Sequence, residues 1–199
     1  PRIGRAVREE KMEYILHTPC TAADLAPLRA GDTVRLSGVV YTARDQAHAR
    51  MAAALDAGEA LPFDLAGSAI YYVGPTPEKP GAVIGSAGPT TAGRMDACSP
   101  RLLDLGNKVM IGKGKRGKAV KEAVVRNGAV YLAALGGAGA LMAKSVKALE
   151  VIAWPDLGCE AVRRLEVADM PLTVVLDAHG GDLYESGPAA YQKACKSLL

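Results

Sequence analysis

A short polar segment, residues 88–96, combines residue types that can bind and transform an anionic substrate. It reads Gly-Pro-Thr-Thr-Ala-Gly-Arg-Met-Asp and places two hydroxyls, Thr90 and Thr91, close to the guanidinium of Arg94. Arginine binds a carboxylate through two parallel hydrogen bonds, and a threonine hydroxyl can donate to an oxygen or take part in proton transfer. A helix beginning here would add free backbone amides that favour an anion. We interpret the segment as an anion-binding turn, the alternative being a helix cap with an incidental arginine.

A second polar cluster, residues 42–48, follows an alternating segment that predicts a strand. Arg44 would lie at the end of that strand, where it could hold a second carboxylate. His48 lies one helical turn further on and could act as a general acid or base. For Arg44 a charged first helical turn is an equally good reading, and for His48 a packing role is favoured.

A third cluster, residues 111–118, contains four basic residues, of which Lys113 is the first. Gly112, Gly114 and Gly117 satisfy the Gly-x-Gly-x-x-Gly spacing between a predicted strand and helix, which is the dinucleotide-binding fingerprint. However, the next predicted strand ends without an acidic residue, and dinucleotide loops are usually apolar. We therefore interpret Lys113 as a cation directed at an anionic ligand, and retain a dinucleotide-binding oxidoreductase domain as the alternative.

The composition limits the classes of protein that the chain could represent. The chain has 199 residues with 49% apolar side chains and a net charge of +3, which suits one folded domain. The net charge is too small for a nucleic-acid-binding surface. The sequence contains no run of 18 apolar residues, so it does not indicate a membrane span. Four widely spaced cysteines argue against disulfides and against a metal site built from this chain alone, and we expect a cytoplasmic location.

The predicted elements favour a single α/β domain with a mixed sheet over residues 12–199, preceded by a flexible leader over residues 1–11. Strands and helices are interspersed without a strict alternation, and residues 82–86 read as a buried strand before the polar segment. Strands are expected at residues 13–17, 33–41, 70–73, 109–111, 129–134, 146–154 and 172–177. Helices are expected at residues 21–25, 44–57, 99–105, 116–126, 141–145 and 189–199.

The segment Gly88–Asp96 resembles the GPTT(S/A)GRMD signature of class I iron–sulfur fumarases and L-tartrate dehydratases. The match lies in the β subunit, which is equivalent to the C-terminal domain of the fused enzymes. Three further blocks, Arg44–His48, Tyr72–Pro75 and Met110–Gly114, are similar to family motifs in the same order. The resemblance covers roughly residues 13–185 and implies a swivelling β/β/α domain.

The resemblance also implies a reaction and a division of labour. It implies reversible addition of water across the double bond of a dicarboxylate, with a [4Fe-4S] cluster held by cysteines of a separate α subunit. By carry-over, Thr90 acts at the reacting carbon, Arg44, Thr91 and Arg94 bind substrate, and Lys113 assists. We expect an α2β2 assembly in which this chain, taken alone, is inactive.

Three hypotheses remain from the sequence. The first is a fumarate hydratase β subunit, with an L(+)-tartrate dehydratase β subunit as its alternative, because the arginines do not distinguish two dicarboxylates. Fumarate is favoured because it is the commoner substrate of two-subunit forms. The second is the dinucleotide-binding domain, and the third is a non-catalytic module that retains the fold.

Overall fold

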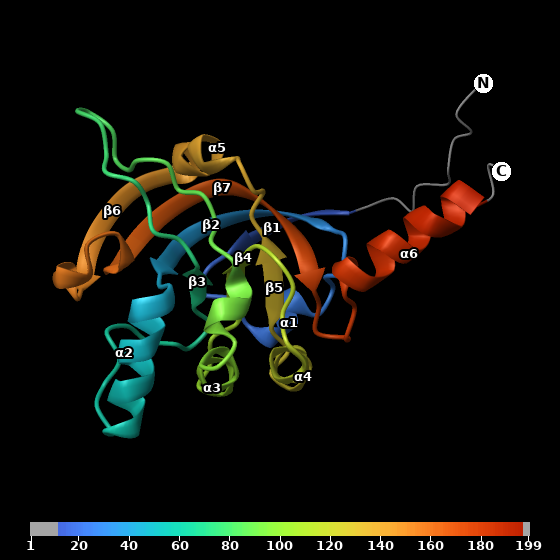
Figure 1. Cartoon of the computed structure of the whole chain (residues 1–199), viewed down its shortest axis with the longest axis horizontal. Coiled ribbons are helices and arrows are strands. Elements are labelled where there is room, and N and C mark those ends of the chain that lie inside the picture. Colours follow the sequence, from blue (N-terminus) through green and yellow to red (C-terminus); the bar gives the residue numbers. More distant parts are fainter. Residues whose placement is uncertain (1–11, 197–199) are drawn as a thin grey trace.

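The computed structural model describes residues 12–196 as a mixed α/β structure (Figure 1). The expected leader, residues 1–11, lies outside the described residues. The strands are β1 (Glu13–His17), β2 (Thr33–Thr42), β3 (Ala69–Tyr71), β4 (Val109–Gly112), β5 (Val130–Ala133), β6 (Val146–Ala153) and β7 (Val162–Leu176). The α-helices are α1 (Ala22–Leu25), α2 (Asp45–Asp56), α3 (Ser99–Asp104), α4 (Lys118–Arg126), α5 (Gly139–Ser145) and α6 (Leu183–Lys196). Two 3-10 helices complete the list, η1 (Ala92–Met95) and η2 (Pro155–Glu160).

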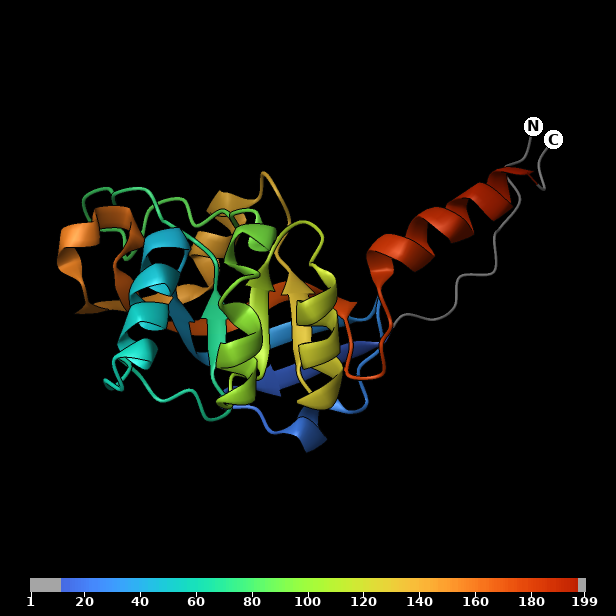
Figure 2. The ribbon, with the colours of Figure 1, turned by 60° about the horizontal axis from the view of Figure 1, so that its bottom comes forward.

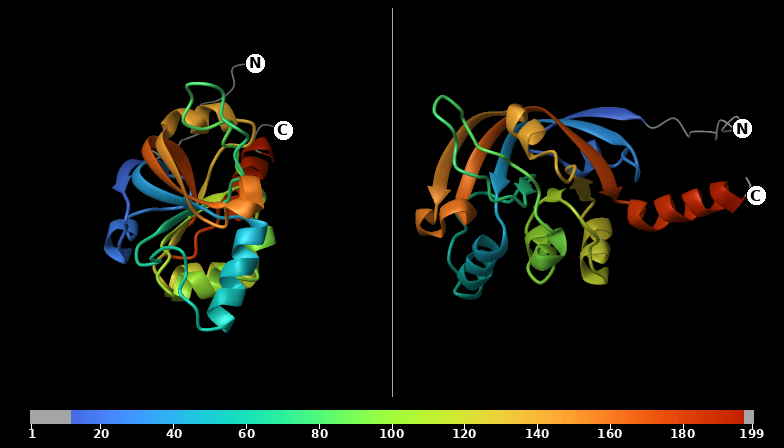
Figure 3. Two further views of the ribbon diagram at one scale, coloured as in Figure 1. Left: turned by 90° about the vertical axis from the view of Figure 1, so that its left-hand side faces the viewer. Right: turned by 45° about the horizontal axis from the view of Figure 1, so that its top comes forward.

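Five of the seven strands close into a barrel. Strands β2, β3, β4 and β5 run parallel in that order, and β7 pairs antiparallel with both β5 and β2 to complete the circle. β1 extends the sheet beside β2, and β6 extends it beside β7. Figure 3 shows the strongly curved β7 arching over the short strands. The predicted mixed sheet is therefore confirmed, and the closure is a feature that the sequence pattern did not indicate.

Alternating side chains of the barrel strands form two separate apolar cores. One face contributes residues such as Leu36, Tyr71 and Ile111, which pack together with side chains from all five barrel strands. The other face contributes Ile70, Met110 and others to a second core beneath α2, α3 and α4. Figure 2 shows these three helices side by side over the strands. Both faces of β3, β4 and β5 are thus buried, which explains the nearly continuous apolar sequences of these three strands.

The carboxyl ends of the four parallel strands lie together at one rim of the barrel. Register pairs join Thr42 to Tyr71, Tyr71 to Ile111, and Gly112 to Ala133. The segments that follow these strands therefore emerge side by side. All the predicted site residues lie in these segments, which is where parallel α/β folds usually bind ligands.

One prediction about local structure was wrong, and another covered only part of its strand. Residues 82–86 form part of a long loop and not a strand, because Val83 points outward and is 45% exposed, whereas only Ile84 is buried. The predicted strand at residues 172–177 is the second half of β7, which begins ten residues earlier at Val162. Charged residues such as Arg164 and Glu166 hid the first half, because one face of that segment is solvent-exposed. None of the helices within residues 12–196 is both long and apolar enough to cross a bilayer.

Gly112, at the end of β4, lies where the packing leaves no space for a side chain. A Cβ atom at this position would lie 2.9 Å from Cδ2 of Tyr72, 3.1 Å from Cβ of Ala92 and 3.5 Å from Cε2 of Tyr131. Glycine thus lets two tyrosine rings and η1 close over the strand end.

We predict that Gly112→Ala lowers the free energy of unfolding by about 1–3 kcal/mol, because the added methyl must displace packed rings. Urea denaturation of the purified chain measures this change. Gly187→Ala is the matched control, since that site in α6 has its nearest neighbour at 3.8 Å. The control should be neutral or stabilising by up to about 1 kcal/mol. Equal stabilities of Gly112→Ala and the wild type would contradict the packing argument.

Candidate anion-binding site

Two arginines expected to bind carboxylates, Arg44 and Arg94, meet at a shared acidic residue, Asp45. Arg44 is the N-cap residue of α2, and Arg94 lies in η1. Oδ2 of Asp45 lies 3.2 Å from Nε of Arg44, and Oδ1 of Asp45 lies 3.0 Å from Nε of Arg94. Because one carboxylate offsets the repulsion between two guanidiniums, both cations stay close together at the rim.

The hydroxyl of Thr90 lies against the end of Arg94. Nη2 of Arg94 donates a hydrogen bond to Oγ1 of Thr90. The backbone amide of Thr90 donates to the carbonyl of Tyr72 at 2.8 Å, which fixes the turn to the end of β3. The polar segment therefore folds back on the strand end that precedes it by 16 residues of loop. The hydroxyl and the guanidinium, which are four residues apart, thus contact each other within one turn.

Backbone pairing brings Lys113 beside the same turn. The amide of Lys113 donates to the carbonyl of Thr90 at 3.3 Å, and the amide of Ala92 donates to the carbonyl of Lys113 at 2.8 Å. These two bonds form a short parallel bridge between Thr91 and Lys113. The Lys113 side chain is exposed, and it has no ion-pair partner within residues 12–196. The expected helix start is a single 3-10 turn, and its first amide, that of Ala92, is already bonded.

A second acidic residue, Glu160, also approaches Nε of Arg44. Oε1 of Glu160 lies 3.5 Å from Nε of Arg44, and Oε2 accepts a hydrogen bond of 2.7 Å from the amide of Gln46. Glu160 ends η2, which lies between β6 and the start of β7. The antiparallel course of β7 explains why residues more than a hundred positions apart meet here.

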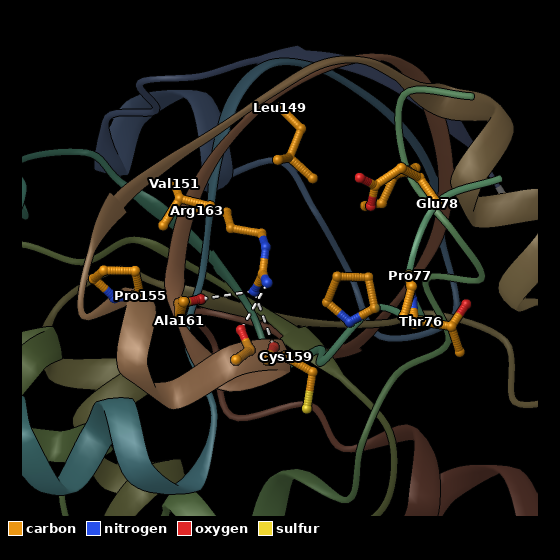
Figure 4. Close-up of a pocket in the computed structure, with 12 residues that line it drawn as sticks. Thr76, Pro77, Glu78, Leu149, Val151, Pro155, Cys159, Ala161 and Arg163 are labelled. Atoms are coloured by element: carbon orange, nitrogen blue, oxygen red, sulfur yellow. Dashed lines mark hydrogen bonds between the residues drawn. The ribbon is translucent and has the colours of Figure 1, made fainter. Parts of the chain in front are cut away.

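Arg163 holds η2 in place through three backbone carbonyls. Its guanidinium donates to the carbonyls of Gly158 at 2.7 Å, Cys159 at 3.0 Å and Ala161 at 3.0 Å (Figure 4). These bonds define one wall of a cavity of about 420 Å³. Leu149 and Val151 of β6 line a second side of the cavity, and Thr76 to Glu78 line the third (Figure 4). Arg163 therefore positions the turn that delivers Glu160 to Arg44.

Gly74 brings the segment after β3 into close contact with Arg44. A Cβ atom at Gly74 would lie 2.9 Å from Nη1 of Arg44 and 3.3 Å from the carbonyl oxygen of Cys159. The Arg44 side chain, which is 23% exposed, thus lies in a slot between this glycine and η2. Any side chain at position 74 would displace the guanidinium.

His48 is buried next to the arginines, with only 3% of its surface exposed. Its Nδ1 lies 3.1 Å from the carbonyl of Arg44, and its ring contacts Tyr72 edge-on at 5.3 Å between centroids. Its Nε2 has no hydrogen-bond partner among residues 12–196. Burial lowers the pKa of His48 to about 4, so the imidazole is neutral near pH 7. His48 also lines a cavity of about 220 Å³ with Asp45 and Arg94. The favoured packing interpretation agrees with this geometry.

The side chains at the rim are suited to an anion and not to a metal. Within the described residues, no three His, Cys, Asp or Glu side chains gather as possible metal ligands. Two guanidiniums, an ammonium and a hydroxyl instead offer hydrogen-bond donors from the three segments that follow β2, β3 and β4. Asp45 and Glu160 were not assigned a role from the sequence. The adjacency of Asp45 to Arg44 was a usable signal, whereas nothing local to Glu160 indicated its partner.

Fold and site together define a small α/β barrel domain that presents a cationic, hydroxyl-bearing cluster at one rim. The chain belongs to the Fumarase C-terminus family, whose model matches residues 1–187. The sequence-based resemblance is thus confirmed at the level of the family.

The similar proteins include fumarate hydratases and an L(+)-tartrate dehydratase subunit. The chain is 42% identical to Fumarate hydratase 2 of Leishmania major over 80% of its length, which covers 28% of that protein. It is 38% identical to the aerobic class I fumarate hydratase of Escherichia coli (strain K12), over 92% of this chain and 33% of the relative. It is 34% identical to the L(+)-tartrate dehydratase subunit beta of the same strain, over 86% of this chain and 87% of the relative. The chain therefore spans about a third of the fumarate hydratases and most of the tartrate dehydratase subunit.

The burial of His48 predicts a specific pH dependence of stability. Its folded-state pKa of about 4 lies below the usual 6.5, so between these values the unfolded chain binds more protons. Stability contributed by the neutral imidazole is present above pH 6.5 and is lost as pH falls toward 4. In His48→Asn the slope of unfolding free energy against pH should be shallower by up to about 1.4 kcal/mol per pH unit in this window. If the free energy of unfolding, measured with urea, changes with the same slope against pH in the variant and in the wild type across pH 4–6.5, the low pKa of His48 is contradicted.

Proposed function

We propose that the chain is the β subunit of a class I hydro-lyase that adds water to fumarate to give L-malate. It would supply groups that bind carboxylates and transfer a proton at a site completed by a cluster-bearing α subunit, in an α2β2 assembly. The observation that carries the proposal is the convergence of Thr90, Arg94, Arg44 and Lys113 at one rim of a domain of the Fumarase C-terminus family. We further propose that the domain swivels relative to its partner and that the enzyme works in the cytoplasm.

The two arginines would bind the carboxylates of the substrate. Asp45 engages Nε of Arg44 and Nε of Arg94. The Nη groups of Arg44 then form the part of its guanidinium that can receive one carboxylate. Lys113 and the Thr91 hydroxyl, both exposed, would contact the same carboxylate or its neighbour. A site built from fixed charges on several strand ends binds the substrate without large reorganisation.

Thr90 would transfer a proton at the reacting carbon. A free hydroxyl is a poor base and needs a neighbour that stabilises its deprotonated form. Nη2 of Arg94 donates to Oγ1 of Thr90, so a positive charge adjoins this oxygen. The same contact orients the hydroxyl, because the Thr90 amide is anchored to Tyr72. We propose that an acid from the α subunit completes the proton transfer.

The [4Fe-4S] cluster would be held by cysteines of the α subunit. When bound, such a cluster supplies an open iron that acts as a Lewis acid toward substrate oxygens. In this chain Cys20 and Cys98 are buried in the apolar cores, and Cys159 lies apart from them at η2. The role of this chain is thus to bind and orient the dicarboxylate.

The geometry disfavours dinucleotide binding at residues 112–117. In dinucleotide sites, the amides at the start of the following helix bind the pyrophosphate. Here the amide of Gly117, the N-cap of α4, donates to Oδ2 of Asp96 at 2.5 Å. That position is therefore occupied by an internal carboxylate. The L(+)-tartrate dehydratase reading remains the alternative, since both substrates carry two carboxylates.

The first test of this proposal is the activity of the assembled enzyme. The purified chain should show no hydratase activity alone and should convert fumarate to L-malate when mixed anaerobically with its cluster-bearing partner. Loss of the ultraviolet absorbance of fumarate measures the rate. A kcat/KM at least tenfold higher for fumarate than for L-tartrate supports the assignment. The reverse ratio would establish the tartrate alternative, and inactivity toward both would exclude the proposed function.

Substitutions at the rim test the individual roles. Thr90→Val should lower kcat by about 10²–10⁴-fold, because it removes the proton-transferring hydroxyl, whereas Thr90→Ser should retain most activity. Arg94→Ala and Lys113→Ala should lower kcat/KM by about 10–100-fold through loss of charge-assisted hydrogen bonds. Lys115→Ala, an exposed lysine of the same loop, is the control for Lys113→Ala. Full activity of Thr90→Val in the assembled enzyme would favour a non-catalytic module.

A further inference from the structure

A buried arginine that cannot reach the substrate lies directly below the proposed site. The Arg116 side chain is 0% exposed. Its guanidinium carbon lies 5.3 Å from the ring centroid of Tyr72 and 5.1 Å from that of Tyr131. The two rings project from neighbouring segments over Gly112, which leaves them room. A buried cation between aromatic rings is held in one orientation.

Hydrogen bonds fix the guanidinium of Arg116 on its remaining sides. Nε donates to Oδ1 of Asp96 at 2.6 Å, and Nη2 donates to Oγ of Ser99 at 2.7 Å. Nη1 lies 3.2 Å from Sδ of Met110 and 3.5 Å from the hydroxyl of Tyr72. These directions match the planar fork of arginine, and the single ammonium of lysine could not satisfy them together.

Asp96 connects two loops through its two carboxylate oxygens. Oδ1 accepts from Arg116, and Oδ2 accepts from the amide of Gly117 at 2.5 Å. Asp96 follows η1, which contains Arg94, whereas Arg116 and Gly117 follow Lys113 in the loop after β4. The carboxylate thus joins the segment carrying Arg94 to the segment carrying Lys113.

The two loops are therefore joined at two levels. On the exposed side they share the backbone bridge between Thr91 and Lys113. On the buried side they share the ion pair between Asp96 and Arg116. Two attachments fix both the separation and the rotation of one loop relative to the other, whereas the bridge alone would leave a hinge.

We propose that Arg116 and Asp96 are positioning residues for the hydration reaction, an inference that rests on the proposed function. They set the distance between the Thr90 hydroxyl, the Arg94 guanidinium and the Lys113 ammonium without contacting the substrate. A displacement of about 1 Å in such groups can cost about 10²-fold in rate. The effect falls on kcat, because Asp45 still holds Arg94 beside Arg44 when the lower ion pair is lost.

Kinetics of the assembled enzyme test the proposal through Asp96→Asn, Arg116→Lys and the double variant. Each single variant should lower kcat about 10–100-fold while the KM for fumarate changes less than about threefold. The double variant should be no worse than the poorer single variant, because both substitutions disrupt the same ion pair between Asp96 and Arg116. Asp104→Asn and Arg126→Lys are the controls. These two residues form a comparable ion pair, with 2.6 Å between Nη2 of Arg126 and Oδ2 of Asp104, but the pair is exposed and lies away from the rim. Single variants with kcat within twofold of wild type would overturn the proposal.

A second readout does not depend on activity. Hydrogen–deuterium exchange of the purified chain should become at least tenfold faster at the amides of Ala92 and Lys113 in Asp96→Asn, with β5 unchanged. If this variant does not fold, Ser99→Ala, which removes one hydroxyl, should give the same pattern at smaller amplitude. Unchanged exchange at both amides in a folded variant would overturn the coupling. Inactivity of the wild-type assembly would instead reject the proposed function. The exchange result would still test whether Asp96 and Arg116 couple the two loops.

Discussion

The antiparallel pairing of β2 with β7 is the constraint on which the rest of the structure depends. It runs from the pair Thr33 and Thr173 to the pair Thr42 and Arg163, and it closes five strands into a barrel. Closure buries one face of every barrel strand in a common core and removes sheet edges that would otherwise remain unpaired. Because β7 runs against its neighbours, its beginning lies beside the carboxyl ends of the parallel strands. The turn before β7 is thereby brought to the rim where Arg44 lies.

The charges at this rim act through position more than through stability. Ion pairs that are partly exposed contribute only about 0–1 kcal/mol, and Asp45 is 28% exposed. The effect of Asp45 is to keep two guanidiniums close together and oriented. Asp45 joins the two guanidiniums, whereas Asp96 joins the segment carrying Arg94 to the loop carrying Lys113 through a fully buried partner, Arg116. Such preorganisation is how a site of fixed charges favours a developing anion at little reorganisation cost.

The sequence predicted the elements of this structure better than their arrangement. The helices at α2, α3 and α4 and the strand at β2 were placed within a few residues, because their periodicity and flanking glycines are local signals. The partners of Glu160 and Arg116 could not be predicted, because they come from positions far along the chain. The loop at residues 82–86 was mistaken for a strand because apolar composition alone does not reveal that Val83 faces solvent.

Among the site residues, too, local contacts follow from the sequence and distant ones depend on the fold. The spacing of Thr90 and Arg94, four residues apart in a turn, already places the hydroxyl and the guanidinium together. The proximity of Lys113 could not be predicted without the pairing of β3 with β4, because a bridge between the loops that follow these strands sets it. The roles of these residues in substrate binding and catalysis stay predictions.

A crystal structure of the assembled two-chain enzyme with succinate tests the central claim most directly. Succinate is the saturated counterpart of fumarate and cannot be hydrated, so it should report the bound position of the dicarboxylate. The account predicts a carboxylate within hydrogen-bonding distance of Arg44 or Arg94, with Lys113 and the Thr90 hydroxyl facing the same molecule. Succinate bound away from this rim, or a rim buried without access to ligand, would contradict it.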